Sequence, residues 1–366
     1  TLDTQDFPVN IEFTADLVFT HDGVGGETII PVSLMASEIG GLSERTLDMA
    51  FGWNMVSVNV DPEEPDVVQL TRDLVENDLL EIMKNGAGQF YSPLFNFNNI
   101  PGWMVDQGYM LKTAEDCQLT ISGEAVAPDQ PIELHQGWQM IAYFPRVPVD
   151  AIEALSGIVE SLEMAKDGEG RFYSPAFGFS NMGDLSEGNG YMIKLTEAAD
   201  LIYTIEDELA QNLSYDFQQP EILPVVKPTG DNMSLLVISE NPSDDDLEVG
   251  VFASRNMVGS GRITNGYCGV AIWGDDTTTE TCDGALMGES LNIKLHNLSG
   301  EVEDVRYISL RGKNQYDSDA LWAIQLETSA LPIEFGISTI WPNPFNNVTN
   351  IDYSVTEPDR VSMFVT

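Results

Sequence analysis

The stretch Gly52–Val60, GWNMVSVNV, returns later in the chain as GWQMIAYFP at Gly137–Pro145. In both copies apolar and polar residues roughly alternate, a pattern typical of a half-buried β-strand. A stretch that repeats itself is the first sign of internal duplication, and duplication decides the architecture wherever it occurs. We therefore take these residues as the opening strands of two tandem units.

The similarity continues downstream of both strands. Phe90–Pro93 (FYSP) recurs at Phe172–Pro175, and Gly108–Lys112 (GYMLK) recurs as GYMIK at Gly190–Lys194. The short FYSP and GYM segments read as strands and turns, and we expect them to be structural. Each unit is thus predicted to end in a short strand, a turn and a further strand.

A helix is predicted between the two strand regions of each unit. The segments 65–84 and 148–166 begin with proline and aspartate and carry apolar residues at roughly helical spacing. Gly86 and Gly168 follow them, as expected for glycines that end helices.

Each copy carries one tryptophan in its first strand, Trp53 and Trp138, and two interpretations of this pair are open. Exposed aromatic rings stack on sugar ligands, whereas aromatic residues beside strand residues more often pack in a core. We favour the core, with each indole beneath the helix of its unit. Trp103 occurs only in the first copy, where the second has Leu185, so Trp103 is the better candidate for a surface contact.

The charge of the chain restricts its partners. Its 366 residues include 59 acidic and 16 basic side chains, for a formal net charge of −43. Such a surface repels nucleic acid and anionic lipid and attracts divalent cations. No run of 18 apolar residues occurs, so we predict no transmembrane helix.

The residue types that carry chemistry are sparse. The three histidines, His21, His135 and His296, stand in no zinc-binding pattern, and no nucleophile elbow or phosphate-binding loop is present. Paired carboxylates could catalyse glycoside hydrolysis, but among 59 acidic residues some pair will always lie close, so such a pair does not indicate a catalytic site. We therefore expect a protein that is not an enzyme.

One loop in the C-terminal half is a candidate for a metal site and a disulfide. Asp275, Asp276 and Asp283 supply oxygen ligands of the kind that Ca²⁺ prefers, although acidic residues in turns also cap backbone N–H groups. Cys268 and Cys282 flank this loop and would close it in an oxidising compartment, stabilising it by about 3 kcal/mol. Calcium is thus the one cofactor that the sequence suggests.

From Met233 the pattern becomes one of short strands separated by Gly, Asn and Asp turns, which is typical of a β-sandwich. The preceding 204–230 region contains three prolines and reads as a linker. The first fifty residues also read as strands.

The segment Trp341–Asn346, WPNPFN, and the NIDYS that follows resemble the start of the C-terminal sorting domain of type IX secreted proteins. Trp341 stands where the family usually has Tyr, while Pro342, Asn343, Pro344, Phe345 and Asn346 match. The resemblance covers about 26 residues, and the later strands of that domain do not follow. Met233–Glu327 resembles a β-rich module of large secreted proteins from the same bacterial groups. The resemblance implies a secreted or cell-surface protein of a Gram-negative bacterium, and no reaction.

These features together predict a mainly β fold in which tandem strand–helix–strand repeats precede a β-sandwich module and a partial Ig-like segment. The predicted order is an N-terminal β segment (1–50), repeat one (51–134), repeat two (135–205), a linker (206–231), a β-sandwich (232–330) and the Ig-like segment (331–366).

Three functions remain open. The first is a structural subunit that assembles with copies of itself into an extracellular filament, tube or sheath. The second is a glycan-binding or adhesion module. The third is the non-catalytic part of a secreted hydrolase. We favour the first, because repeats and β modules are present and an active-site pattern is not.

Overall fold

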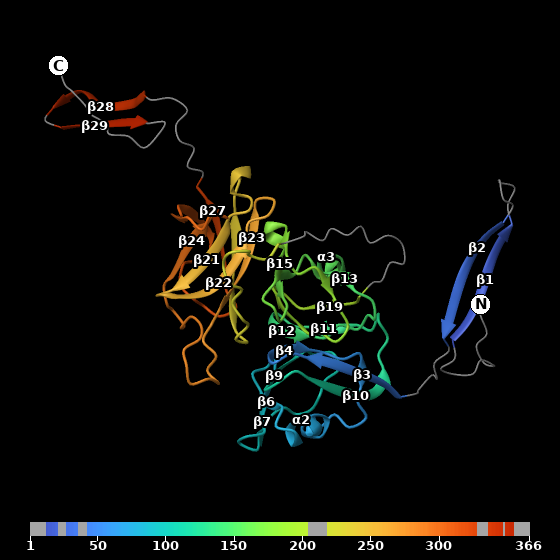
Figure 1. Ribbon diagram of the computed structural model, residues 1–366. Helices are drawn as coiled ribbons and strands as arrows, with labels where there is room; N and C mark the ends of the chain where they lie inside the picture. The colour runs from blue at the N-terminus through green and yellow to red at the C-terminus, as the bar shows by residue number, and fades with distance from the viewer. Residues whose placement is uncertain are drawn as a thin grey trace. The chain divides into compact units, whose positions relative to one another are not determined.

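The structure is a computed structural model that describes residues 12–20, 27–35, 42–203, 218–327, 336–346 and 348–354. The protein is mainly β, as predicted, with several antiparallel sheets and a few short helices (Figure 1). It divides into two compact units. Unit 1 contains both repeats together with 226–232 and 273–286, and unit 2 contains 218–225, 233–272 and the described residues from 287 onward.

The two repeats of unit 1 have the same central sheet of five strands. In repeat 1 the order is β4 (Gly52–Val56), β9 (Tyr109–Thr113), β6 (Leu80–Asn85), β7 (Phe90–Ser92) and β8 (Phe97–Asn98). In repeat 2 it is β12 (Gly137–Ile141), β18 (Tyr191–Leu195), β14 (Leu162–Lys166), β15 (Phe172–Ser174) and β16 (Phe179–Ser180). The register is also shared, since Trp53 pairs with Lys112 and Trp138 pairs with Lys194.

The predicted long helices are only partly correct. Helices α1 (Val67–Leu70) and α3 (Ala151–Ala154) begin as expected, with the carboxylates of Asp66 and Asp150 accepting backbone N–H bonds at their N-termini. Repeat 1 continues with α2 (Arg72–Glu76), and repeat 2 continues with a 3₁₀ turn, η1 (Ser156–Ile158).

The second half of each predicted helix is instead a strand, β6 or β14, in the middle of the central sheet. The apolar residues of these segments face the sheet core, where Met83 and Met164 are buried. A short apolar run satisfies helical and extended spacing equally well, and pairing with β9 and β18 decides between them. Gly86 and Gly168 therefore follow strands rather than ending helices.

Each repeat begins before its tryptophan strand. In repeat 1, β3 (Leu42–Met49) pairs with β10 (Cys117–Ala125), which also pairs with β5 (Val60–Asp61). In repeat 2, β11 (Ile132–Leu134) pairs with β19 (Ala199–Leu201), and β13 (Val149–Asp150) pairs with β17 (Asp184–Leu185). We use "repeat 1" for 42–125 and "repeat 2" for 132–201 from here on.

Unit 2 contains two four-stranded sheets, the predicted sandwich-like arrangement. One has the order β23 (Tyr267–Trp273), β20 (Asn232–Ile238), β27 (Leu321–Leu326) and β26 (Tyr307–Arg311). The other has the order β22 (Asn256–Arg262), β21 (Glu248–Ala253), β24 (Leu291–His296) and β25 (Val302–Asp304). A 3₁₀ turn, η3 (Pro242–Asp244), precedes β21. The end residues Asn232 and Trp273 belong to unit 1.

Part of the predicted linker is fixed to unit 2. The carboxylate of Glu248 in β21, which is fully buried, accepts the consecutive backbone N–H groups of Glu221, Ile222 and Leu223. Burial alone would raise the pKa of Glu248, but these three hydrogen bonds outweigh it and lower the pKa. Pro220 and Pro224 therefore belong to an anchored segment, because a buried carboxylate holds the backbone between them.

Two hairpins complete the described chain: β1 (Glu12–Thr20) with β2 (Glu27–Met35), and β28 (Gly336–Asn346) with β29 (Val348–Ser354). Both are two-stranded sheets. None of the described helices is long and apolar enough to cross a membrane.

Candidate functional site

The two repeats meet through reciprocal hydrogen bonds. The N–H of Gly190 donates to the carbonyl of Met55 at 3.0 Å, and the N–H of Gly108 donates to the carbonyl of Met140 at 3.3 Å. The same reciprocity holds two residues further along the chain, just past each strand, where the N–H of Ser57 donates to the carbonyl of Gly188 and the N–H of Ala142 donates to the carbonyl of Asp106. Each bond joins the first strand of one repeat to the Gly-Tyr turn of the other, so the repeats are related by a pseudo-twofold axis.

This junction leaves two clefts that the pseudo-twofold relates. Cleft 1, of about 330 Å³, is lined by β3 and β4 of repeat 1 and by two turns of repeat 2. Cleft 2, of about 240 Å³, is lined by β11 and β12 of repeat 2 and by the two equivalent turns of repeat 1. Trp53 lines cleft 1 and Trp138 lines cleft 2.

Cleft 1 is polar and most of its charged groups are already paired. The Asp167 carboxylate accepts the Nε–H of Arg171 at 2.6 Å and the backbone N–H groups of Glu169 and Arg171. Burial raises the pKa of Asp167, and Arg171 opposes that rise. Glu187 pairs with Arg45 at 2.9 Å. These pairs fix the walls of cleft 1 and leave few groups for a ligand.

Cleft 2 combines an aromatic and apolar wall with hydrogen-bonding groups. Trp138 contributes the aromatic surface, and Ile132 and Leu134 contribute apolar surface. Asp106 lines the same cleft, and its Oδ1 atom is buried without a hydrogen-bond partner among the described residues. A buried carboxylate oxygen without a partner is costly, and an acceptor of this kind in a cleft calls for a donor from a ligand or a water molecule.

The amide of Gln139 is positioned at the edge of cleft 2. It donates to the carbonyl of His135 at 2.7 Å and accepts the N–H of that residue at 3.1 Å. This exchange holds the loop before Trp138 in place. The side chains that line cleft 2 therefore stand on a braced strand and on two tight turns.

Comparison with known protein families, with curated proteins and with solved structures finds no match. The chemistry of the clefts is accordingly argued from their own residues.

Beside each cleft tryptophan lies a pair of lysines. In repeat 1, Lys84 lies 4.5 Å and Lys112 lies 6.0 Å from the centroid of the Trp53 ring. In repeat 2, Lys166 lies 5.1 Å and Lys194 lies 5.9 Å from that of Trp138. These distances are in the range of cation–π contacts. The tryptophans are half-buried on a sheet face, so our prediction that they plug the core beneath the helices is wrong.

In repeat 1 a carboxylate completes this cluster. Asp276, from the 273–286 segment, accepts the indole N–H of Trp53 at 2.9 Å and pairs with Lys112 at 3.1 Å through the same oxygen, Oδ2. Its other oxygen accepts both the N–H and the hydroxyl of Thr278. Burial opposes ionisation of Asp276, but the bonds from Thr278, Trp53 and Lys112 prevail and lower its pKa.

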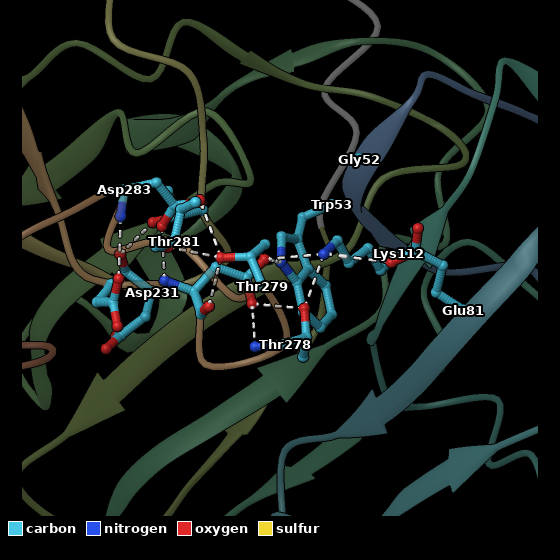
Figure 2. Close-up of polar contacts among 12 residues, drawn as sticks. Gly52, Trp53, Glu81, Lys112, Asp231, Thr278, Thr279, Thr281 and Asp283 are labelled. Carbon is cyan, nitrogen blue, oxygen red and sulfur yellow. Dashed lines mark hydrogen bonds and ion pairs between the residues drawn. The ribbon is translucent and has the colours of Figure 1, made fainter. Parts of the chain in front are cut away.

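Lys112 uses further acceptors around the same point. It donates to the hydroxyl of Thr278 at 2.7 Å and pairs with Glu81 at 3.2 Å. Figure 2 shows Lys112 between Glu81 and the threonine loop, with the Trp53 indole beside it. Burial lowers the pKa of Lys112, but the bonds from Asp276 and Glu81 outweigh that and raise it. An aspartate carboxylate is thus the group that this tryptophan–lysine arrangement takes in repeat 1.

The carboxylates of the 275–283 loop, where we predict calcium, make hydrogen bonds within the loop, and calcium at this loop stays a prediction. Asp275 accepts the N–H of Asp283, and Asp283 accepts the N–H of Asp276, so these carboxylates brace the turn. Among the described residues no group of three potential ligands is gathered for a metal ion. The braced loop holds Asp276 in hydrogen-bonding contact with Trp53.

The Cys268–Cys282 disulfide is not formed between these two described residues. Cys268 is fully buried in β23, where its sulfur lies against Gly261, and burial raises its pKa. Cys282 is exposed, and its thiol contacts the carbonyl of Gly284.

Trp103 is not a surface residue, contrary to our prediction. Its side chain is only 2% exposed and stacks on Tyr109 at 4.2 Å between ring centroids. Leu185, at the equivalent place in repeat 2, is also fully buried. The difference between the copies is therefore one of core volume.

The sorting motif Trp341–Asn346 lies in β28, and its side chains are outside the described part of the structure. The sequence analysis missed Asp106, Lys84 and Lys166. The lysines had a visible signal, since Lys84 and Lys166 occupy equivalent positions in the two repeats, as Lys112 and Lys194 do. Asp106 had none, because repeat 2 has Gly188 in its place.

Proposed function

We propose that the protein is a non-enzymatic glycan-binding module, with a sugar ring seated in cleft 2 against Trp138. The observation that carries this proposal is the buried Oδ1 atom of Asp106, an acceptor without a partner among the described residues in a cleft with an aromatic wall. Sugars present hydroxyl donors around an apolar ring face. They suit a cleft that combines an acceptor with an indole.

The size of cleft 2 limits the ligand. Its volume of about 240 Å³ is below the usual range for sites of drug-sized ligands, about 300–1,000 Å³. A single sugar unit at the end of a chain fits this description better than a long stretch of polysaccharide. The braced loop at His135 and Gln139 supports a preformed site, which lowers the entropic cost of binding.

A glycan array followed by titration calorimetry tests the proposal. We expect the intact protein to bind a defined set of glycans, and Asp106→Ala to weaken that binding at least tenfold. Asp129→Ala is the matched control, since Asp129 is an exposed acid in a nearby loop. The absence of any bound glycan, or full binding by Asp106→Ala, would refute the proposal.

Self-association is a second candidate, favoured by the two-stranded hairpins β1–β2 and β28–β29. Two-stranded hairpins are marginally stable alone and gain stability when further strands add to their edges. Strand addition between copies would build the filament, tube or sheath that the sequence predicts. Negative-stain electron microscopy at physiological salt should then show ordered polymers, and dispersed monomers at high concentration would contradict this candidate.

We also propose that the protein is secreted to the cell surface of a Gram-negative bacterium. This proposal rests on the resemblance of Trp341–Asn346 to a type IX sorting motif. Fractionation of the producing cells tests it. The protein should appear in the medium or at the outer surface, and retention of the intact chain inside the cell would count against it.

A further inference from the structure

The contacts of Trp53 and Lys112 in repeat 1 indicate which chemical group the equivalent residues of repeat 2 can bind. The indole N–H of Trp53 and the ammonium of Lys112 converge on one carboxylate oxygen of Asp276. Asp276 is 6% exposed, so the carboxylate is enclosed where these donors meet. An indole N–H and an ammonium that converge on one oxygen form a charge-assisted site for a carboxylate.

Repeat 2 presents the same two donors in the same register. Trp138 and Lys194 are cross-strand partners, as Trp53 and Lys112 are. Lys194 pairs with Glu163 at 3.2 Å, which matches the pairing of Lys112 with Glu81. The framework of the carboxylate site is therefore duplicated.

The two sites differ in what fills them. An ammonium has three hydrogens to donate, and those of Lys112 go to Glu81, Asp276 and Thr278. Within the described residues, Lys194 has Glu163 as its polar partner, and the indole N–H of Trp138 makes no hydrogen bond. The side chain of Lys194 is 35% exposed, whereas that of Lys112 is 11% exposed. The indole N–H and the ammonium that hold the Asp276 carboxylate in repeat 1 therefore have no equivalent carboxylate between them among the described residues of repeat 2.

We propose that Trp138 and Lys194 bind the carboxylate of an acidic sugar whose ring occupies cleft 2. Trp138 belongs to both features, because it lines cleft 2 and lies beside Lys194. This inference rests on the proposed function and specifies its ligand as a hexuronate-type sugar.

The electrostatics favour a sugar with one carboxylate over a polyanion. The chain carries a net charge of −43, so a long acidic polymer would meet repulsion over most of the surface. At physiological salt the screening length is about 8 Å, and a single carboxylate at Lys194 feels mainly its immediate neighbours.

The test uses a matched pair of probes, D-glucuronate and D-glucose, which differ in the carboxylate at C6. Binding is followed through the ¹⁵N-indole resonance of Trp138, assigned by its loss in Trp138→Phe. We expect glucuronate to bind about tenfold more tightly than glucose, as a charge-assisted hydrogen bond provides. Lys194→Gln should abolish that preference while glucose binding persists, which also shows that the variant is folded.

Two controls separate the outcomes. Lys112→Gln, at the equivalent position already filled by Asp276, should leave the preference unchanged. N-acetylaspartate, a carboxylate without a sugar ring, should bind at least tenfold more weakly than glucuronate, and equal binding would overturn the assignment to a sugar. Equal binding of glucose and glucuronate would overturn the inference and leave the proposed function standing, whereas binding of neither would overturn both.

Discussion

Gly108 and Gly190 meet at the centre of the repeat pair, where a Cβ atom on either would lie 3.3 Å from the Cα atom of the other. Both glycines sit in the Gly-Tyr turn of their own repeat and donate to the first strand of the other. Side chains at these positions would force the two turns apart. The glycines therefore set how closely the repeats approach, and with it the dimensions of both clefts.

Gly190→Ala should destabilise unit 1 by about 1–3 kcal/mol, because the new methyl would lie 2.8 Å from the carbonyl oxygen of Val56, a backbone atom. Urea denaturation followed by tryptophan fluorescence measures the loss. Gly157→Ala is the control, since a Cβ there meets no atom within 4 Å. Equal stability of the two variants would show that the close approach of the repeats carries no energetic constraint.

Trp103→Leu should be tolerated better than Trp103→Ala, because repeat 2 already fills the equivalent core position with Leu185. Truncation to alanine removes a buried aromatic ring stacked on Tyr109 and should cost about 3–5 kcal/mol. The leucine variant should lose clearly less in the same denaturation assay. A larger loss for leucine than for alanine would argue against the equivalence of the two cores.

The duplication was predictable from sequence because the strand-forming GWNMV and GYMLK segments recur with the same spacing of apolar residues. The same periodicity misled at β6 and β14. Leu79, Ile82 and Leu162 satisfy helical spacing, and only the pairing of these segments with β9 and β18 makes them strands. That pairing joins residues about thirty positions apart, so it cannot be recognised from the local sequence.

The candidate site was less predictable for the same physical reason. Trp53 and Asp276 are separated by 223 positions, so their hydrogen bond depends on the folded arrangement of unit 1. The carboxylates of the 275–283 loop suggested calcium because sequence shows ligand types without showing their partners. Asp106 stood out only when its carboxylate oxygen was found buried and unpartnered in cleft 2.

Asp276→Ala should release the 273–286 segment from Trp53 and cost about 2–4 kcal/mol, since it leaves the partly buried Lys112 and the indole N–H without their acceptor. The emission of Trp53 should change as its environment opens. Glu280→Ala removes an acid from an exposed position of the same loop and should shift stability by less than about 0.5 kcal/mol. Indistinguishable unfolding curves for the two variants would contradict a role for Asp276 in docking the segment.

Glu248→Gln should destabilise unit 2 at neutral pH by about 1.5–3 kcal/mol, because the carboxylate accepts three consecutive backbone N–H groups that a neutral amide cannot all satisfy. The pKa of Glu248 is lower in the folded protein than its ordinary value. Its contribution is therefore complete above the unfolded-state pKa, about 4.3, and is lost as the pH falls through the folded-state pKa. The difference in unfolding free energy between wild type and Glu248→Gln should accordingly be constant near pH 7 and shrink below about pH 4.

Glu240→Gln, at an exposed glutamate of the same unit, should show little difference at either pH. A Glu248→Gln difference that stays constant down to pH 2 would mean that the charge on Glu248 does not hold the 218–225 segment.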